Sequence, residues 1–220
     1  MAQWSQALVF IERIQLLGNA LGPAFLQLPP RYSPQYMEDL DDFLGHWQDA
    51  TDAKLAVEVR HPDWFTAEGR DRLNRLLLSH NVGRVILDTR PIYRNLHSDD
   101  DPQQLSQRRK PDLPLHASVT APFSLVRLIT HPNSEKNQAY LDEWSNRVER
   151  WLNKGIDLYF FVHCPIEDHS PHTARQLQER LVEKNLAIPC LQYPDPSEAI
   201  EDGGSQGRSQ LSLFSPNAED

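Results

Sequence analysis

The sequence has 220 residues and is 39% hydrophobic, which is enough to bury one substantial core, so we expect one domain with appendages. Its formal net charge of −9 and pI near 5.4 argue against a surface that holds nucleic acid or anionic lipid by bulk electrostatics. Any contact with nucleic acid would need a local basic site or a partner protein.

The cysteines and the apolar runs bear on the compartment. Cys164 and Cys190 provide neither a disulfide framework nor zinc-ligand spacing, which fits a reducing environment. No uninterrupted apolar run is long enough to cross a bilayer, and the first residues lack the basic-then-apolar order of a signal peptide. We therefore expect a soluble, cytoplasmic protein.

Short apolar runs of strand length alternate along the chain with longer amphipathic segments. The five runs are rich in β-branched or aromatic residues and cover 24–28, 55–60, 84–88, 124–129 and 158–163. The helical patterns between them begin at capping residues, namely Ser33, Thr66, Asn133 and Ser170. Proline follows Ser33 and Ser170, at the helical position whose N–H would be unpaired in any case.

The spacing of the runs predicts the fold class. About thirty to forty residues separate successive strands, which leaves room for the right-handed helical crossover that a parallel sheet requires. The sequence therefore predicts an α/β fold, either a barrel or an open doubly wound sheet. The alternative, an α+β domain with antiparallel strands, would need hairpin signals, and the only Asp-Gly pair is Asp202-Gly203 near the end of the chain.

Two stretches interrupt the alternation of strand and helix. Residues from about 90 to 120 form a long polar connection of a length typical of functional lids or of disorder. From about 197 onward the composition turns to Glu, Asp, Gly and Ser, which cannot bury enough surface to fold. We therefore expect a folded domain over 1–196 and a disordered tail over 197–220.

Five phrases match the strand signatures of one protein family in the same order. They are LGP with QLPP within 21–30, VEVRHPDWF at 57–65, LDTRP at 87–91, LVRL at 125–128, and YFFVHCP at 159–165 followed by Ser170-Pro171. These phrases resemble strands four to eight of the bacterial domain-of-unknown-function family 72 (YecE-like), over nearly all of residues 5–185. The resemblance implies a parallel β/α barrel of the TIM type.

Members of that family begin with three further β/α units, including a first strand like Gly-Thr-Ser-Gly-Trp, and nothing in this sequence corresponds to them. The resemblance therefore implies a partial barrel, either because the sequence is a fragment or because the absent units come from elsewhere. Five parallel strands cannot close an eight-stranded cylinder, so we expect unpaired strand edges.

Polar residues fall at the ends of the predicted strands, where barrel enzymes hold their catalytic groups. Because side chains alternate along a strand, Glu58 and Arg60 should point to the interior while Val57 and Val59 face the helices. The other polar residues expected at the same rim are Gln27, Asp88, Arg127 and His163.

Charged groups buried without partners cost on the order of several kcal/mol, so these side chains should pair with one another or with a ligand. In the functional interpretation, Arg60 and Arg127 clamp a carboxylate or phosphate. Glu58 or Asp88 would then be a general base, and His163 an acid or base. In the structural interpretation, the same charges form an internal ion-pair network that only fixes the fold. Both interpretations stay open.

A divalent metal ion is a third hypothesis, because Glu58, His61, Asp88 and His163 are acceptable ligands. No short His-x-x-x-His or Glu-x-x-His pairing supports it, so the cofactor is left undetermined.

Two residues after the second predicted strand are added to the candidate site, and four other histidines are not. We count His61 and Trp64 with Gln27 and the two arginines among the ligand-binding residues. Trp64 and Phe65 would stack on a ring-shaped ligand, or else pack under a loop. Four histidines are expected in loops at the surface: His116, His131, His169 and His172.

The pentapeptide Gln210-Leu211-Ser212-Leu213-Phe214 resembles the motif by which bacterial replication and repair proteins bind the ring-shaped sliding clamp. Its apolar side chains would fill a groove, and Gln210 would supply a directional hydrogen bond. A polar leader from about 198 to 209 would let the peptide reach that groove. The alternative is an ordinary amphiphilic terminus.

Two functional hypotheses follow. The first is a phosphodiesterase-like hydrolase that acts on a phosphate-bearing or nucleic-acid substrate and is brought to sites of replication or DNA repair by its tail. The second is a non-catalytic adaptor whose barrel binds a small anionic ligand or a protein.

Overall fold

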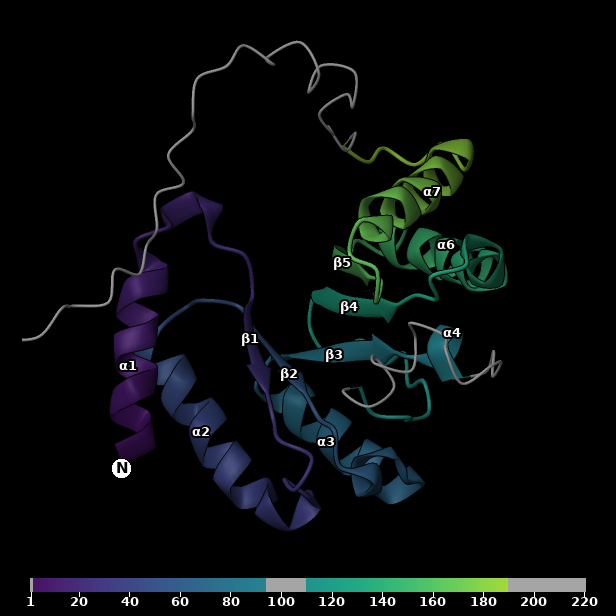
Figure 1. Cartoon of the computed structure of the whole chain (residues 1–220). Coiled ribbons are helices and arrows are strands. Elements are labelled where there is room, and N and C mark those ends of the chain that lie inside the picture. The colour runs from purple at the N-terminus through teal and green to yellow at the C-terminus, as the bar shows by residue number, and fades with distance from the viewer. Residues whose placement is uncertain (1, 94–109, 190–220) are drawn as a thin grey trace, which may run out of the picture. The chain divides into compact units, whose positions relative to one another are not determined.

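The computed structural model describes residues 2–93 and 110–189. Its centre is a sheet of five parallel strands that lie in chain order (Figure 1). The strands are β1 (Ala24–Gln27), β2 (Leu55–Glu58), β3 (Gly83–Asp88), β4 (Phe123–Ile129) and β5 (Asp157–His163). Each agrees with a predicted run to within two residues at either end, which confirms the parallel α/β class.

Helices connect the strands. They are α1 (Ala2–Gln15), η1 (Gly18–Ala20), η2 (Pro34–Tyr36), α2 (Met37–Ala50), η3 (Pro62–Phe65), α3 (Ala67–Ser79), α4 (Arg90–Tyr93), η4 (Ser134–Asn137), α6 (Gln138–Leu152) and α7 (His169–Glu183). The sequence patterns did not predict α1, which precedes the first strand. Among the described residues, no helix combines the length and the apolar character needed to cross a membrane.

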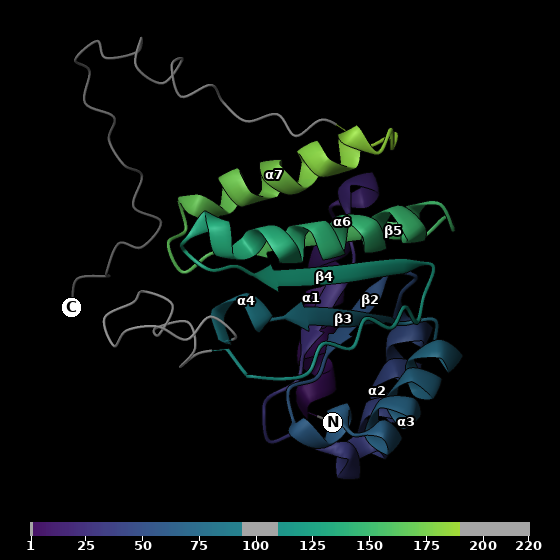
Figure 2. The same ribbon diagram turned by 90° about the vertical axis from the view of Figure 1, so that its right-hand side faces the viewer.

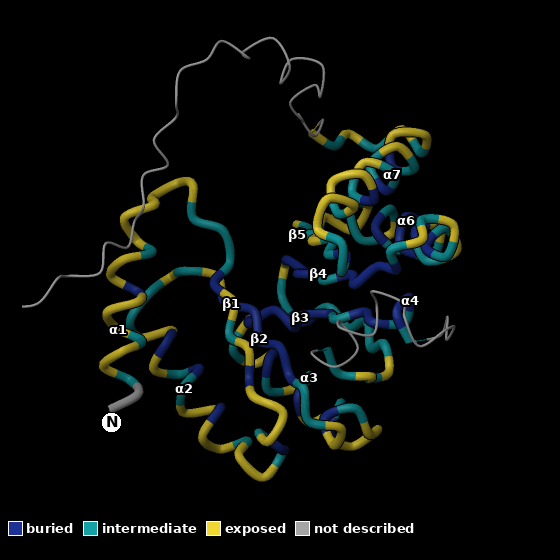
Figure 3. The backbone as a smooth tube through the Cα atoms, viewed as in Figure 1, coloured by how far each residue is buried: buried dark blue, intermediate teal, exposed yellow. Residues whose placement is uncertain are grey.

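Two apolar clusters join the helices to one side of the sheet. The first packs β2 residues such as Val57 against α2 and α3 residues such as Leu44 and Leu73. The second packs Val126 of β4 against Trp144 of α6, together with residues of α7. Figure 2 shows α6 lying along β4 with α7 beyond α6, and Figure 3 shows β3 and β4 buried while the outer surfaces of the helices are exposed. The alternation expected for Val57 and Val59 is confirmed, since both lie in the first cluster.

The opposite side of the sheet, which we call the open face, carries a smaller cluster. Its members are Ala56, Val85, Phe123 and Leu125, with Ala121 and Tyr159 packed against them. Two aromatic side chains of the edge strands remain largely exposed on this face, with Phe25 of β1 at 42% and Phe161 of β5 at 55%. On the open face, the side chains of the central strands are therefore buried, and aromatic side chains of the two edge strands are exposed to solvent.

The predicted caps are confirmed at two of the four positions. The Thr66 side chain accepts a hydrogen bond from Gly69 N at the start of α3, and the Asn133 side chain accepts one from Glu135 N at the start of η4. Ser33 precedes η2 without a side-chain bond. The prediction for Ser170 was wrong: α7 begins before it, and its hydroxyl accepts from Cys164 N instead.

The long connection predicted between 90 and 120 begins as α4 and ends as an extended segment from 110 to 122. The described residues up to Ile188 belong to one compact unit. The expected domain boundary at 196/197 and the predicted clamp-binding peptide lie outside the described residues.

Candidate functional site

Glu58 is the centre of a charged cluster at the carboxyl end of the sheet. It ends β2, is 1% exposed, and receives a guanidinium group on each oxygen. Arg60 Nε lies 2.7 Å from Oε1, and Arg127 Nη1, from β4, lies 2.5 Å from Oε2. Two positive charges thus share one buried negative charge. The structure brings these three predicted residues together although 69 positions separate Glu58 from Arg127.

Gln27 and Phe25 extend this cluster to β1. Gln27 pairs with Glu58 in the strand register, and its Oε1 accepts a hydrogen bond of 2.7 Å from Arg60 Nη2. The Arg127 guanidinium lies 5.1 Å from the centre of the Phe25 ring, a cation–π contact on the open face. Arg60 is held by Gln27 of β1, and Arg127 of β4 reaches past β3 to Glu58 of β2 and Phe25 of β1. Both guanidinium groups retain N–H groups beyond those that these contacts use.

His163 ends β5 on the side of the sheet that carries Tyr159 and Arg127. Burial lowers its pKa, and the positive charges of Lys110 and Arg127 lower it further, while Glu167 opposes them. The imidazole is therefore mostly neutral at pH 7 and able to accept a proton. His163 thus gives this end of the open face a proton acceptor on the same side of the sheet as the Glu58 cluster, near enough to Arg127 for that charge to affect its pKa.

The structure does not bring Asp88 to this cluster. Asp88 ends β3 as predicted, but its side chain is fully buried on the helix side. One carboxylate oxygen accepts from Trp144 Nε1 at 2.8 Å, and both accept from Arg90, at 2.9 and 2.8 Å. Arg90 also donates to Glu143 of α6 at 2.8 Å. This network joins β3 to α6 and supports the structural interpretation for Asp88.

Two predicted ligand-binding residues have structural contacts instead. Trp64 is fully buried, and its Nε1 donates to the carbonyl oxygen of Tyr32 at 2.7 Å, so it packs beneath a loop. His61 Nδ1 accepts from Asp63 N at the start of η3. Within residues 2–93 and 110–189, no group of three or more His, Cys, Asp or Glu side chains lies close enough to hold a metal ion. The four ligands proposed from the sequence therefore do not form such a group.

Each of the four histidines expected in surface loops meets that expectation in part: His116 and His131 lie in loops, and His169 and His172 are exposed. His131 is 3% exposed, and its Nδ1 accepts from Asn133 N at 2.9 Å. His169 and His172 lie in α7 rather than in a loop. His116 is partly buried, with its ring 5.5 Å from that of Phe65. No sequence pattern indicated the contacts of His131 and His116, since the first depends on the following turn and the second on a ring of another segment.

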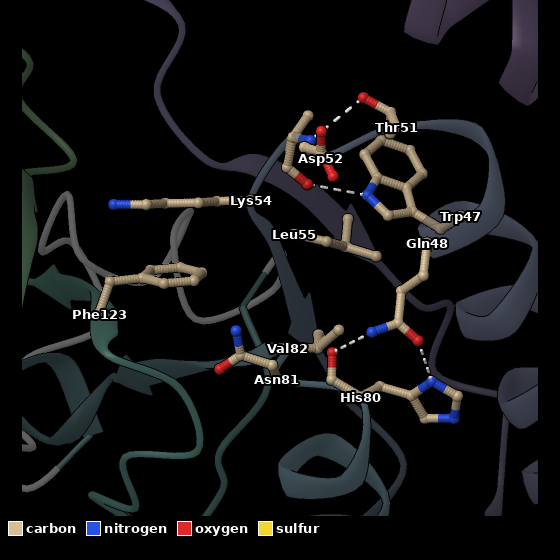
Figure 4. Close-up of a pocket in the computed structure, with 11 residues that line it drawn as sticks. Trp47, Gln48, Thr51, Asp52, Lys54, Leu55, His80, Asn81, Val82 and Phe123 are labelled. Carbon is tan, nitrogen blue, oxygen red and sulfur yellow. Dashed lines mark hydrogen bonds between the residues drawn. The ribbon is translucent and has the colours of Figure 1, made fainter.

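A cavity of about 240 Å³ lies at the opposite, amino end of the strands (Figure 4). Its polar groups bond to one another: Trp47 Nε1 donates to Ala53 O at 3.0 Å, and Gln48 Nε2 donates to His80 O at 2.8 Å. His80 in turn lies 2.6 Å from an oxygen of Asp41. In parallel β/α folds this end of the sheet contributes to stability more than to chemistry, and the internal bonding agrees with that role.

Comparison with known proteins identifies the family. The sequence profile described as "Protein of unknown function DUF72" matches residues 2–198. The chain belongs to the DUF72 family. It is 32% identical over 173 residues to the UPF0759 protein YecE of Escherichia coli K12, which covers 78% of this chain and 62% of YecE. The resemblance seen in the five sequence phrases is thereby confirmed.

Solved structures of DUF72 proteins share the fold. A family member from Enterococcus faecalis V583 superimposes with a TM-score of 0.56 at 17% identity, over 77% of this chain and 63% of that one. Another from Thermotoga maritima MSB8 gives a TM-score of 0.54 at 16% identity, over 79% and 63%. The chain thus spans less than two thirds of the length of each of these relatives.

Proposed function

We propose that the Glu58 cluster of this DUF72 protein binds the anionic group of a phosphate-bearing ligand. The observation that carries the proposal is the ratio of charges: two guanidinium groups share a single buried carboxylate. Arg60 and Arg127 side chains are 12% and 21% exposed, so each is held rigidly but still borders solvent. A guanidinium fixed in this way offers a planar pair of donors suited to two phosphate oxygens.

A hydrolase remains the more specific form of this proposal, with His163 as its proton acceptor. Glu58 is a poor choice of base because both of its oxygens accept from arginine, and Asp88 faces the helices. The lowered pKa of His163 leaves the imidazole unprotonated near neutral pH, as a general base requires. The alternative is an adaptor that binds the same anion without chemistry.

We also infer that the five strands are part of a barrel wall. They are all parallel and lie in chain order, and β1 and β5 form the two edges of the sheet. The YecE-like family begins with three further β/α units, and this chain spans 62% of YecE. Three strands between β5 and β1 would complete eight, and they would cover Phe25 and Phe161.

Binding can be measured by calorimetric titration of the full chain with a short phosphodiester, dithymidine monophosphate, at constant ionic strength. We expect Arg127→Gln to weaken the affinity by about tenfold or more, because charge-assisted hydrogen bonds contribute roughly 1.5–3 kcal/mol each. Arg150→Gln, on the α6 helix away from the cluster, is the matched control and should leave the affinity unchanged. Equal affinities of the wild type and Arg127→Gln would contradict the proposal.

Hydrolysis is tested separately with bis(p-nitrophenyl) phosphate, with and without added Mg²⁺ or Mn²⁺. A hydrolase predicts release of p-nitrophenol that His163→Gln abolishes while dithymidine monophosphate still binds. Binding without turnover in the wild type would favour the adaptor and overturn the hydrolase.

We further propose that Gln210-Leu211-Ser212-Leu213-Phe214 binds a bacterial sliding clamp, on the strength of its sequence. The expected result is that a fluorescent peptide of 205–218 binds purified clamp, and that changing Leu213 and Phe214 to alanine removes the signal, because the apolar pair would fill the groove. Replacing Ser209 with alanine is the control. An equal polarisation signal from the double variant would refute specific recognition.

A further inference from the structure

A cavity of about 330 Å³ lies on the helix side of the sheet, apart from the Glu58 cluster. Its lining comes from three elements: Arg70 of α3, Arg147 of α6, and the segment from Leu115 to Ser118. That volume is at the lower end of the range of small-molecule sites, about 300–1,000 Å³. Three of its lining residues, Arg70, His116 and Arg147, carry or can carry positive charge.

The cavity exists because the connection from β3 to β4 returns as extended chain. Thr89 Oγ1, beyond the end of β3, donates to Pro111 O at 3.0 Å, and Thr120 Oγ1 donates to Val82 O, before β3, at 2.7 Å. The segment therefore runs back along β3, as Figure 2 shows. A helix in this place would fill the space between α3 and α6 with side chains, whereas the thin segment leaves a hollow.

Arg84 of β3 lies beside this cavity and is 2% exposed. Its Nη1 donates to Asn74 Oδ1 at 2.9 Å, and Asn74 Nδ2 in turn donates to Ser118 Oγ in the lining, at 3.2 Å. Its guanidinium lies 5.7 Å from the Phe65 ring, which packs on His116. Arg84 Nη2 is buried and has no hydrogen-bond partner among the described residues, and the one charge that acts on its pKa there is the positive charge of Arg70.

Two further nitrogens around the cavity share this condition. His116 Nδ1 and Arg147 Nε are buried and, within the described part of the chain, make no hydrogen bond. Burial, with the charge of Arg70, lowers the pKa of Arg84 to about 10. Burial and the charges of Arg84 and Arg70 also lower the pKa of His116. Arg70 and Arg147 of the lining pair with Asp71 and Glu143, so the charge without a carboxylate partner is that of Arg84, which lies behind the lining and close enough to His116 to affect its pKa. The buried nitrogens without a hydrogen bond are gathered around this one space.

We propose that this cavity, which we call the Arg84 pocket, binds a small phosphate-type anion, either inorganic phosphate or a small phosphate monoester. A buried guanidinium without a counter-charge is strongly unfavourable, and an oxyanion would supply both the missing charge and acceptors for Arg84 and Arg147. The Ser118 hydroxyl accepts from Asn74 and keeps its own hydrogen for a further acceptor. Leu115 and Ala117 give the pocket an apolar wall for a small organic group.

The test measures the melting temperature and the affinity of the full chain for inorganic phosphate, with chloride at equal ionic strength as the reference. We expect phosphate to raise the melting temperature of the wild type and of Arg127→Gln, and Arg84→Gln to weaken phosphate affinity by about tenfold or more. Arg147→Gln, at the partly exposed edge of the pocket, serves if Arg84→Gln does not fold, and should weaken binding several-fold.

The outcomes separate this pocket from the Glu58 cluster. Loss of phosphate binding in Arg84→Gln but not in Arg127→Gln supports the Arg84 pocket, whatever becomes of the proposed function. Unchanged affinity in Arg84→Gln, or in Arg147→Gln where that variant is used, overturns it. Arg84→Met gives the last discrimination: if phosphate raises the melting temperature of neither the wild type nor Arg84→Met, the pocket binds no phosphate and the proposal fails.

Discussion

Glu58 and Asp88 show how the same side-chain chemistry is directed to two different sides of one sheet. Each ends a parallel strand, each is at most 1% exposed, and each is neutralised by arginine. Glu58 shares its side of the sheet with Arg127, whereas Asp88 bonds to Trp144 of α6. Only the first can meet a ligand on the open face.

Strand alternation predicted Glu58 because Val57 and Val59 are clearly apolar on the other side of β2. It could not orient Asp88, because the preceding residues of β3, including Val85, Ile86 and Leu87, are apolar on both sides. A strand buried on both faces shows no alternation of apolar and polar residues. The face on which its last side chain lies then depends on the helix that packs there. Arg90 and Trp144, which hold Asp88, were missed for this reason.

The lowered pKa values of His163 and His116 predict how stability depends on pH. Both imidazoles bind a proton less readily when folded than in the unfolded chain, where the pKa is about 6.5. Their contribution to stability is therefore complete above pH of about 7 and is lost as the pH falls below about 6.5. Urea unfolding between pH 7 and about 5 should show this fall, and His163→Gln should reduce its slope. An unchanged slope in that variant would argue against a depressed pKa.

At the scale of elements, local sequence signals placed the strands well and the helix starts less well. Thr66 and Asn133 cap their helices as predicted, because each bonds to a backbone N–H two or three residues ahead. Ser170 looked equivalent in sequence, yet its hydroxyl bonds to Cys164 N. That contact fixes the turn between β5 and α7, and no local pattern distinguishes it from a cap.

Thr66 provides a direct test of the cap. Its hydroxyl accepts from Gly69 N at 3.1 Å, so Thr66→Ala should lower the free energy of unfolding by about 1 kcal/mol in urea titrations. Thr66→Ser keeps the acceptor and should change stability by less than about 0.5 kcal/mol. Similar losses in the two variants would show that the methyl group, and not the hydrogen bond, provides the stabilisation.

At the scale of the whole molecule, the family resemblance and the spacing of the strands predicted the parallel α/β arrangement, which the structure confirms. The sequence did not predict that the helices on one side of the sheet pack into two separate apolar clusters. One apolar cluster joins α2, α3 and β2, and another joins α6, α7 and β4. Arg84 lies near the junction of these clusters, where the extended return of the β3–β4 connection leaves room for the Arg84 pocket. The sequence could not predict this pocket, because it depends on the path of the β3–β4 connection, which has no periodic sequence pattern.

The proposed site depends on one arrangement: Glu58 and Arg127, distant in the chain, share one side of the sheet, and Asp88 lies on the other. A double-mutant cycle of unfolding free energies tests it most directly, using Glu58→Gln, Asp88→Asn and Arg127→Gln, singly and in pairs. We predict a coupling of about 1 kcal/mol or more between Glu58 and Arg127, and additivity within about 0.5 kcal/mol for Asp88 and Arg127. Additive effects in the first pair, or a coupling of that size in the second, would contradict this arrangement.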